Sequence, residues 1–293
     1  IMDQSQSTAF IDNYKFKQYD FREFKKIQPL KSFSLFNVQT AELGTQPVLL
    51  ITYNYFNRDI NHIEELKQNT NFLKIRSRTI LEKIGYIYEN KYLTVVYDRP
   101  EGNLLSFETP SYYQNSSDEV KFYIIDHILK IYLRIKRKVK HHFGYFSPSL
   151  FLFNPFLDTP IMMIEHSFLN IHGKLIDPMM KMIFGYFKNT QYPSDFLMLL
   201  LFIVQFFAKI KKGDKDLDLD YEVLIYRLYL HIINKKTDTG YSFKVIVDNY
   251  IPNEQIKQLI QQYLDKGIAL MNSAYDQEKE SKLLEEFHNA FKS

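Results

Sequence analysis

The stretch SDFLMLLLFIVQFFA, residues 194–208, decides how the second half of this chain is read. Its apolar run from Phe196 to Ala208 is about 13 residues long, whereas a membrane-spanning helix needs roughly 20. A helix that is hydrophobic all round and too short to span a bilayer belongs in the core of a folded domain. We therefore expect a fully buried helix here and no transmembrane segment.

Further helices are expected on both sides of this stretch. Residues 118–142 repeat apolar side chains at helical spacing, and shorter helices are expected over about 221–234, 253–265 and 281–291. The predicted buried stripe of the first of these helices consists of Val120, Tyr123, Ile124, His127, Ile128, Ile131, Leu133 and Ile135. The last helix places Leu283, Leu284, Phe287 and Phe291 on one face, which could cover its own domain or enter a partner's groove.

The first third of the chain favours strands around one helix. Pro47 opens the β-branched and aromatic run VLLITYNYF, and KIGYIYEN and KYLTVVYDR predict two strands joined by a turn at Glu89 and Asn90. Residues 62–76 predict a helix that Asn61 could cap. Two short runs, SLFLFN and PIMMIEH, predict small strands later in the chain. Strands followed by helices predict the α+β class.

The composition excludes several kinds of site. The chain has 293 residues, 45% hydrophobic and 24% charged, which suits a globular protein with a sizeable core. Cysteine is absent, so disulfides, thiolate metal sites and cysteine nucleophiles are excluded. Only nine residues are glycine, which disfavours a glycine-rich phosphate loop. A net charge of +3 predicts no nucleic-acid partner.

Several stretches, in order, resemble the eukaryotic protein kinase family over nearly the whole chain. They are VLLITYN for the strand that carries the kinase lysine, LKIRSRTIL after the C-helix, VVYDRPEGNLLSFE for the hinge with Val96 as gatekeeper, FGYFSPSLFLFN for the catalytic loop, MMIEHSFLN for the metal loop, YPSDFLMLLLFIVQFF for the buried helix, and IPNEQIKQLIQQYL near the C-terminus. The first stretch also resembles the Scy1-like group. The resemblance implies a bilobal fold, with a small β-rich N-lobe containing one main helix and a larger, mostly helical C-lobe.

The residues that this family uses for phosphoryl transfer are largely missing here. By the resemblance, the lysine position falls on about Ile51 (or Thr52), and the helix glutamate falls on Gln68, with Glu64 a turn earlier. The catalytic aspartate falls on Tyr145 and the metal-binding asparagine on Leu150. The metal-loop aspartate falls on Glu165, which is followed by His166 and Ser167. Losing one charge-stabilising group typically costs about 10²–10³ in rate. The resemblance therefore predicts a pseudokinase that is not an enzyme and holds no metal or cofactor.

The expected function is that of a scaffold or structural subunit in a larger protein assembly. The alternative is a nucleotide-binding switch, or a residual atypical kinase that uses Glu165 for metal, because hinge main-chain groups around Arg99 could still contact adenine. Nucleotide binding is the less favoured of the two. The resemblance divides the chain into an N-terminal extension (1–24), an N-lobe (25–98), a C-lobe (99–270) and a C-terminal helical extension (271–293). No secretory signal is visible, and an intracellular, cytoplasmic or cytoskeleton- or cilium-associated location is expected.

Other charged and aromatic features have simpler interpretations. Asp195 aligns with an aspartate that anchors the kinase catalytic loop, and the alternative is an ordinary helix N-cap. The basic run at residues 134–142 is expected to be a solvated helix face. His141, His142, His166 and His172 lack metal-ligand spacing. The aromatic residues at 10–24 either pack back on the domain or dock onto another protein.

Overall fold

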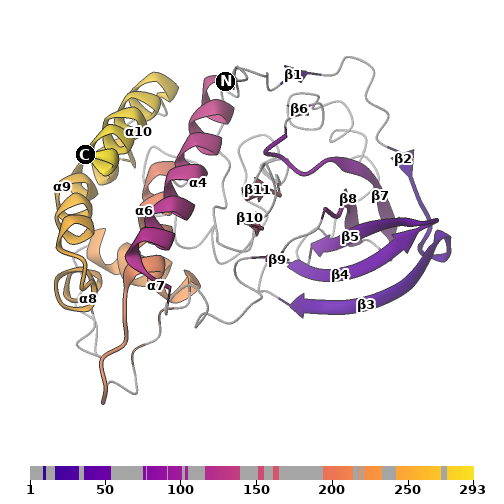
Figure 1. Cartoon of the computed structure of the whole chain (residues 1–293), viewed down its shortest axis with the longest axis horizontal. Helices are drawn as coiled ribbons and strands as arrows, with labels where there is room; N and C mark the ends of the chain where they lie inside the picture. Colours follow the sequence, from indigo (N-terminus) through magenta and orange to yellow (C-terminus); the bar gives the residue numbers. More distant parts are fainter. Residues whose placement is uncertain are drawn as a thin grey trace. The chain divides into compact units, whose positions relative to one another are not determined.

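A computed structural model describes residues 9–10, 17–32, 36–53, 75–76, 78–90, 92–100, 103–104, 116–138, 151–154, 161–164, 194–213, 217, 219, 221–232, 242–271 and 276–293. The chain divides into two compact units. Unit 1 comprises Ile1–Phe107, Ser149–Ile171 and Ile176–Pro178, and unit 2 comprises Glu108–Pro148, His172–Leu175 and Met179–Ser293. All described strands belong to unit 1 and all described α-helices to unit 2 (Figure 1). The expected α+β class is confirmed.

The main sheet of unit 1 has six strands in the order β2-β7-β8-β5-β4-β3. Neighbouring strands are antiparallel, except that β2 runs parallel to β7. The strands are β2 (Lys17–Gln18), β3 (Phe24–Ser32), β4 (Phe36–Leu43), β5 (Gln46–Tyr53), β7 (Lys83–Glu89) and β8 (Tyr92–Asp98). The predicted turn between β7 and β8 is confirmed, and Asn90 adopts φ 52°, a conformation that asparagine tolerates well.

Strand β5 lies in the middle of this sheet and is apolar on both faces. Val48, Leu49, Leu50 and Ile51 are all buried although successive side chains point to opposite faces. One face joins a core cluster of Phe24, Ala41, Val48, Leu50, Ile87 and Val96. The continuous run VLLI is therefore the signature of a central strand with two covered faces.

Part of the N-terminal segment packs on unit 1. Strand β2 pairs with β7, and the Tyr19 N–H donates to the Tyr86 carbonyl at 2.8 Å. Gly85 allows this approach, because a Cβ there would collide with the Lys17 carbonyl oxygen and the Tyr19 ring. Tyr19 and Phe21 also pack against the β-sheet core cluster. Within residues 17–24, the aromatic side chains thus pack back on their own domain.

Two smaller sheets complete the described part of unit 1. Strands β1 (Ala9–Phe10) and β6 (Ile75–Arg76) pair with each other. The predicted helix over 62–76 is therefore wrong at its last two residues, where pairing with a distant segment overrides local periodicity; residues 62–74 lie outside the described residues. The predicted small strands are confirmed as β10 (Phe151–Phe153) and β11 (Ile161–Met163), in a sheet of order β11-β10-β9 with β9 (Asn103–Leu104).

Unit 2 contains six described α-helices. They are α4 (Asp118–Lys138), α6 (Asp195–Phe207), α7 (Tyr221–Ile232), α8 (Phe243–Tyr250), α9 (Glu254–Met271) and α10 (Gln277–Lys292). The predicted buried helix is confirmed as α6, in which every residue except Gln205 is buried. Gly267 of α9 packs directly on α6, since a Cβ there would lie 2.7 Å from Leu197 Cδ2. No helix among the described residues is long and apolar enough to cross a membrane.

The buried face of α4 differs from the predicted stripe. Val120 and Tyr123 are exposed, and His127 is only partly buried. The buried face instead includes Lys121, Ile125, Leu129, Tyr132 and Lys136 besides the predicted isoleucines and Leu133. The helix is apolar on two sides, so its periodicity alone could not identify which side packs against α6 and α10.

Helix α10 covers its own unit. Leu283, Leu284, Phe287 and Phe291 are buried as predicted. The Phe287 ring packs edge-on against Tyr263 of α9 and Phe196 of α6, and the Phe291 ring packs against Phe122 of α4. The apolar face of this helix is consequently not available to a partner.

Candidate functional site

Of the five positions that correspond by resemblance to kinase catalytic residues, one lies within the described residues. Ile51 is in β5, whereas Gln68, Tyr145, Leu150 and Glu165 lie outside the described residues. The structure therefore does not bring these five residues together in a describable site. His166 and Ser167 beside Glu165 are likewise outside the described residues.

Ile51 is packed into the centre of the main sheet. It pairs with Val38 of β4 and Val95 of β8, and its side chain is only 1% exposed. At the next position, the hydroxyls of Thr52 and Thr94 share a hydrogen bond of 2.7 Å. The strand position that resembles the kinase lysine site thus holds an aliphatic side chain in a filled core, and its polar neighbour already has a partner.

In the segment that resembles the kinase hinge, two main-chain N–H groups donate hydrogen bonds to carbonyl groups of unit 1. Val96, at the position that resembles the gatekeeper, is fully buried. The Asp98 N–H donates to the Glu82 carbonyl at 2.9 Å, and the Arg99 N–H donates to the Pro47 carbonyl at 3.2 Å. These two amides are consequently engaged in bonds within unit 1.

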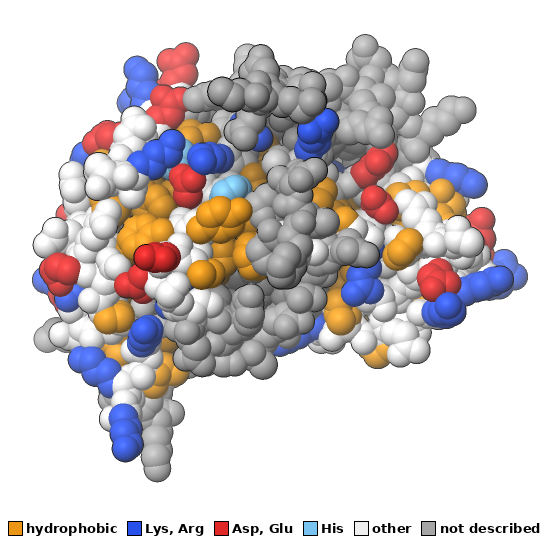
Figure 2. Space-filling model, in the orientation of Figure 1, with side chains coloured by type: hydrophobic (Ala, Val, Ile, Leu, Met, Phe, Trp, Pro, Cys, Tyr) orange, Lys and Arg blue, Asp and Glu red, His pale blue; other side chains and the backbone are white. Residues whose placement is uncertain are grey.

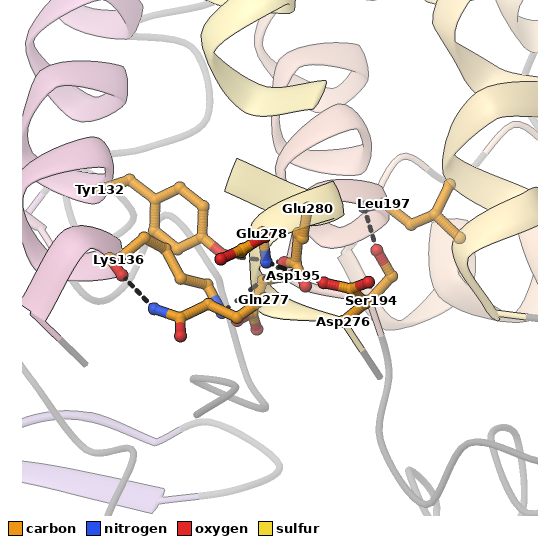
Figure 3. A network of polar contacts seen from close by, with 9 residues as sticks. All are labelled: Tyr132, Lys136, Ser194, Asp195, Leu197, Asp276, Gln277, Glu278 and Glu280. Atoms are coloured by element: carbon orange, nitrogen blue, oxygen red, sulfur yellow. Dashed lines mark hydrogen bonds and ion pairs between the residues drawn. The ribbon is translucent and has the colours of Figure 1, made fainter. Parts of the chain in front are cut away.

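Asp195 forms a buried ion pair in unit 2 (Figure 3). Its Oδ2 lies 2.8 Å from Lys136 Nζ, and the two side chains are 0% and 1% exposed. The N-cap of α6 is Ser194, whose hydroxyl accepts a hydrogen bond from the Leu197 N–H. The interpretation of Asp195 as the N-cap is therefore wrong by one residue. Residues 143–150 of the stretch that resembles the catalytic loop, which Asp195 was predicted to anchor, lie outside the described residues.

Lys136 also contradicts the prediction of a solvated basic face for residues 134–142. It is buried because two acidic side chains from other helices surround its ammonium group: Asp195 of α6 and, at 3.7 Å, Glu280 of α10. Side chains of residues 137–142 lie outside the described set. Charge alone could not reveal this burial, since its cause is a pair of partners far away in sequence.

A polar network surrounds this buried lysine and links α4, α6 and α10 (Figure 3). The Tyr132 hydroxyl donates to Glu280 Oε1 at 3.2 Å, and the Gln277 side-chain amide donates to the Lys136 carbonyl at 2.7 Å. Asp276 begins α10 by accepting hydrogen bonds from the first-turn amides of Glu278 and Lys279. The start of α10 is thereby held against the C-terminal part of α4.

A second polar feature of unit 2 is a groove between α4 and α10. Its volume is about 370 Å³, and it is lined by Lys130, Leu133, Arg134, Glu285, His288, Asn289 and Lys292. Asp126 contacts two of these lining residues, since its carboxylate lies 2.8 Å from both Lys130 Nζ and His288 Nε2. We name this feature the α4–α10 groove.

Burial and charge act in opposite directions on the acid–base pair of this groove. Burial lowers the pKa of His288, although its hydrogen bond to Asp126 acts to raise it. Burial would raise the pKa of Asp126, but hydrogen bonds from Lys130 and His288 hold it below its usual value. Asp126 is therefore the charged member of the pair near neutral pH, and His288 is the neutral one.

Metal binding has no support in the described part of the chain. No cluster of three His, Asp or Glu side chains there could hold a metal ion. The histidines at positions 141, 142, 166 and 172 lie outside the described residues.

Comparison with known sequences identifies no relative of the chain. No protein-family model matches the chain, and a search of curated proteins finds no significant match.

Proposed function

We propose that this chain is a catalytically inactive, protein kinase-like domain that acts as a scaffold or structural subunit of a larger protein assembly. The strand order of unit 1 supports the proposal. Strands β3, β4, β5, β8 and β7 are neighbours in that order, as expected for the small lobe of the kinase fold. The antiparallel pair of β10 and β11 also fits, because β10 lies at the end of the stretch that resembles the catalytic loop and β11 lies at the start of the stretch that resembles the metal loop.

The observation that carries the loss of activity is the burial of Ile51. Phosphoryl transfer needs a cation on this strand to hold the phosphates. An isoleucine that is 1% exposed and paired with valines on both neighbouring strands cannot supply one. Thr52, the alternative position, is equally uncharged and bonds Thr94.

The main-chain amide of Arg99 also supports the proposal. In the kinase fold, adenine is bound by main-chain groups of the hinge, and by the resemblance Arg99 lies at the centre of that contact. The Arg99 N–H already donates to the Pro47 carbonyl at 3.2 Å. A nucleotide would have to replace this bond, so the contact would bring little net gain.

A domain without this chemistry but with an extensive core is suited to binding other proteins. We place the assembly inside the cell, in the cytoplasm or on the cytoskeleton or cilium, in line with the absence of cysteine. Localisation of the tagged chain tests that part separately.

Two measurements on the full chain test the proposal. The first is thermal unfolding with millimolar ATP, with and without Mg²⁺ or Mn²⁺, together with a phosphotransfer assay of the wild type and Glu165→Ala. We expect no thermal shift and no transfer, since a ligand that binds the folded state stabilises it by RT ln(1 + [L]/Kd). A shift, or transfer that Glu165→Ala abolishes, would support a nucleotide switch or residual kinase instead.

The second measurement is affinity purification of the tagged chain from its native source at low and moderate salt. We expect stoichiometric protein partners at both salt concentrations. A chain that sediments alone under native conditions would contradict the scaffold role.

A further inference from the structure

The solvent-facing side of α4 carries a stripe of apolar, aromatic and basic side chains. Val120, Tyr123, His127, Lys130 and Arg134 follow one another at intervals of three or four residues, so they share one face of the helix. Val120 and Tyr123 are 38% and 45% exposed, and the Tyr123 ring packs against the His127 ring. Figure 2 shows hydrophobic side chains interspersed with basic and acidic ones on the face over α4 and α10. The stripe is thus apolar at its N-terminal end and basic at its C-terminal end.

The basic end opens into the α4–α10 groove. Two of the cations that line it are Arg134 on α4 and Lys292 on α10. Neither forms an ion pair within the part of the chain that the structure describes. Lys130 is paired with Asp126, and Glu285 contributes one negative charge to the lining. With Lys130 offset by Asp126, the groove presents the two cations Arg134 and Lys292 against the single carboxylate of Glu285, and His288 is neutral near pH 7.

We propose that this surface is a docking site for an acidic, amphipathic segment of a partner protein. Carboxylates of that segment would lie in the groove between Arg134 and Lys292, and an apolar side chain would cover Tyr123 and Val120. The inference rests on the proposed scaffold function and names the chemistry of its partner.

The argument for this occupant is charge complementarity beside an apolar contact. Carboxylates would form charge-assisted hydrogen bonds with cations that have no ion pair in the described chain. An aromatic side chain with a polar tip, such as Tyr123, is typical of interface centres. A basic or purely apolar segment would leave Arg134 and Lys292 facing like charge or no charge.

The direct test is binding of a defined probe to the full chain. The probe is a fluorescent helical peptide of Glu, Ala and Leu, about 18 residues long so that it can form a helix. Its matched control has Lys in place of Glu. Fluorescence anisotropy is measured for the wild type and for Arg134→Glu, Lys292→Glu and Lys282→Glu. Lys282 is an exposed lysine of the same helix α10 outside the groove, so it controls for net charge.

We expect the acidic peptide to bind the wild type and Lys282→Glu alike, and each groove variant roughly tenfold or more weakly. Binding should weaken with salt, and the lysine peptide should not bind. Equal binding to the wild type and both groove variants, or binding of the lysine peptide, would overturn the proposal. Circular dichroism and urea midpoints that match the wild type show that the groove variants remain folded.

The same variants identify the natural occupant. A photo-crosslinking amino acid in place of Tyr123 should label an acidic segment of a partner purified with the chain, and the label should be lost in Arg134→Glu. If partners copurify equally with the wild type and with both groove variants, the proposed docking site is wrong and the scaffold function stands. If the wild type copurifies no partner, the scaffold function itself fails. A crosslink to a second copy of this chain would contradict the proposed occupant.

Discussion

Replacing Lys136 with methionine should strongly destabilise unit 2. Methionine keeps an unbranched aliphatic side chain of similar length but removes the ammonium group. The Asp195 and Glu280 carboxylates, 0% and 3% exposed, would then lose the cation that lies 2.8 and 3.7 Å from them. Removing one member of a buried ion pair leaves an uncompensated charge in a poorly solvated place.

The expected loss follows from these distances. At an effective dielectric constant of about 20, unit charges at these two separations attract by about 6 and about 4 kcal/mol. Much of that attraction is offset, because the lysine no longer has to be desolvated and a carboxylate can take up a proton. Broken buried pairs accordingly cost about 3–5 kcal/mol, and we expect Lys136→Met to lie in this range.

The assay is urea unfolding followed by far-ultraviolet circular dichroism, which reports mainly on the helices. The matched control is Lys266→Met, because Lys266 and Glu286 are also 2.8 Å apart but their side chains are 45% and 54% exposed. The control should leave the urea midpoint close to that of the wild type, since solvent screens an exposed pair.

A small effect of Lys136→Met, equal to that of Lys266→Met, would show that the buried network contributes no more than a surface pair. A large effect that Lys136→Arg does not reverse would assign the loss to packing around the lysine stem and refute the charge argument. Restoration by Lys136→Arg would support it, since arginine is also a cation and hydrogen-bond donor.

Three further predictions concern other parts of the chain. Because the pKa of His288 is lowered in the folded state, the unfolded state binds more protons below about pH 6.5. The free energy of unfolding should therefore fall as the pH drops below that value. His288→Gln should reduce this dependence on pH, measured by urea titrations at pH 5 to 7.5. Gly85→Val should detach β2 from β7, because its side chain would collide with the Lys17 carbonyl; hydrogen exchange at the Tyr19 amide should accelerate, and unchanged exchange would contradict the contact. Ile51→Lys should lower the free energy of unfolding by about 3 kcal/mol or more and yield no phosphotransfer, because the ammonium would lie in an apolar sheet. A stable variant with phosphotransfer activity would refute the proposed loss of catalytic activity.

Much of the fold could be predicted from local pattern. The run VLLI, the pair of strands around Asn90 and the apolar helix α6 are each specified by neighbouring residues, and the structure confirms them. Helix α8 was missed, although Ser242 caps it and its apolar side chains recur at helical spacing. Such a short helix has a signal that is easily mistaken for a loop.

The features that depend on distant partners could not be predicted. Nothing near Lys136 in the sequence indicates that Asp195 and Glu280 surround it. The α4–α10 groove likewise combines residues of the two helices that only tertiary packing brings together. That Ile51 stands where the resemblance places the kinase lysine stays a prediction; the structure shows only that this side chain is buried in the sheet.

The position of α6 in the chain has a consequence for synthesis on the ribosome. This apolar helix is covered by α9 and α10, which begin at Glu254 and Gln277 and are therefore translated later. At about 5–20 residues per second, α6 waits on the order of ten seconds for these helices after it is made. During that interval the nascent chain contains FLMLLLFIVQFF without the side chains of α9 and α10 that pack on it, and transiently exposed apolar surface of this kind favours aggregation. Helix α6, which is buried in the finished domain, is thus exposed during translation until α9 and α10 have been made.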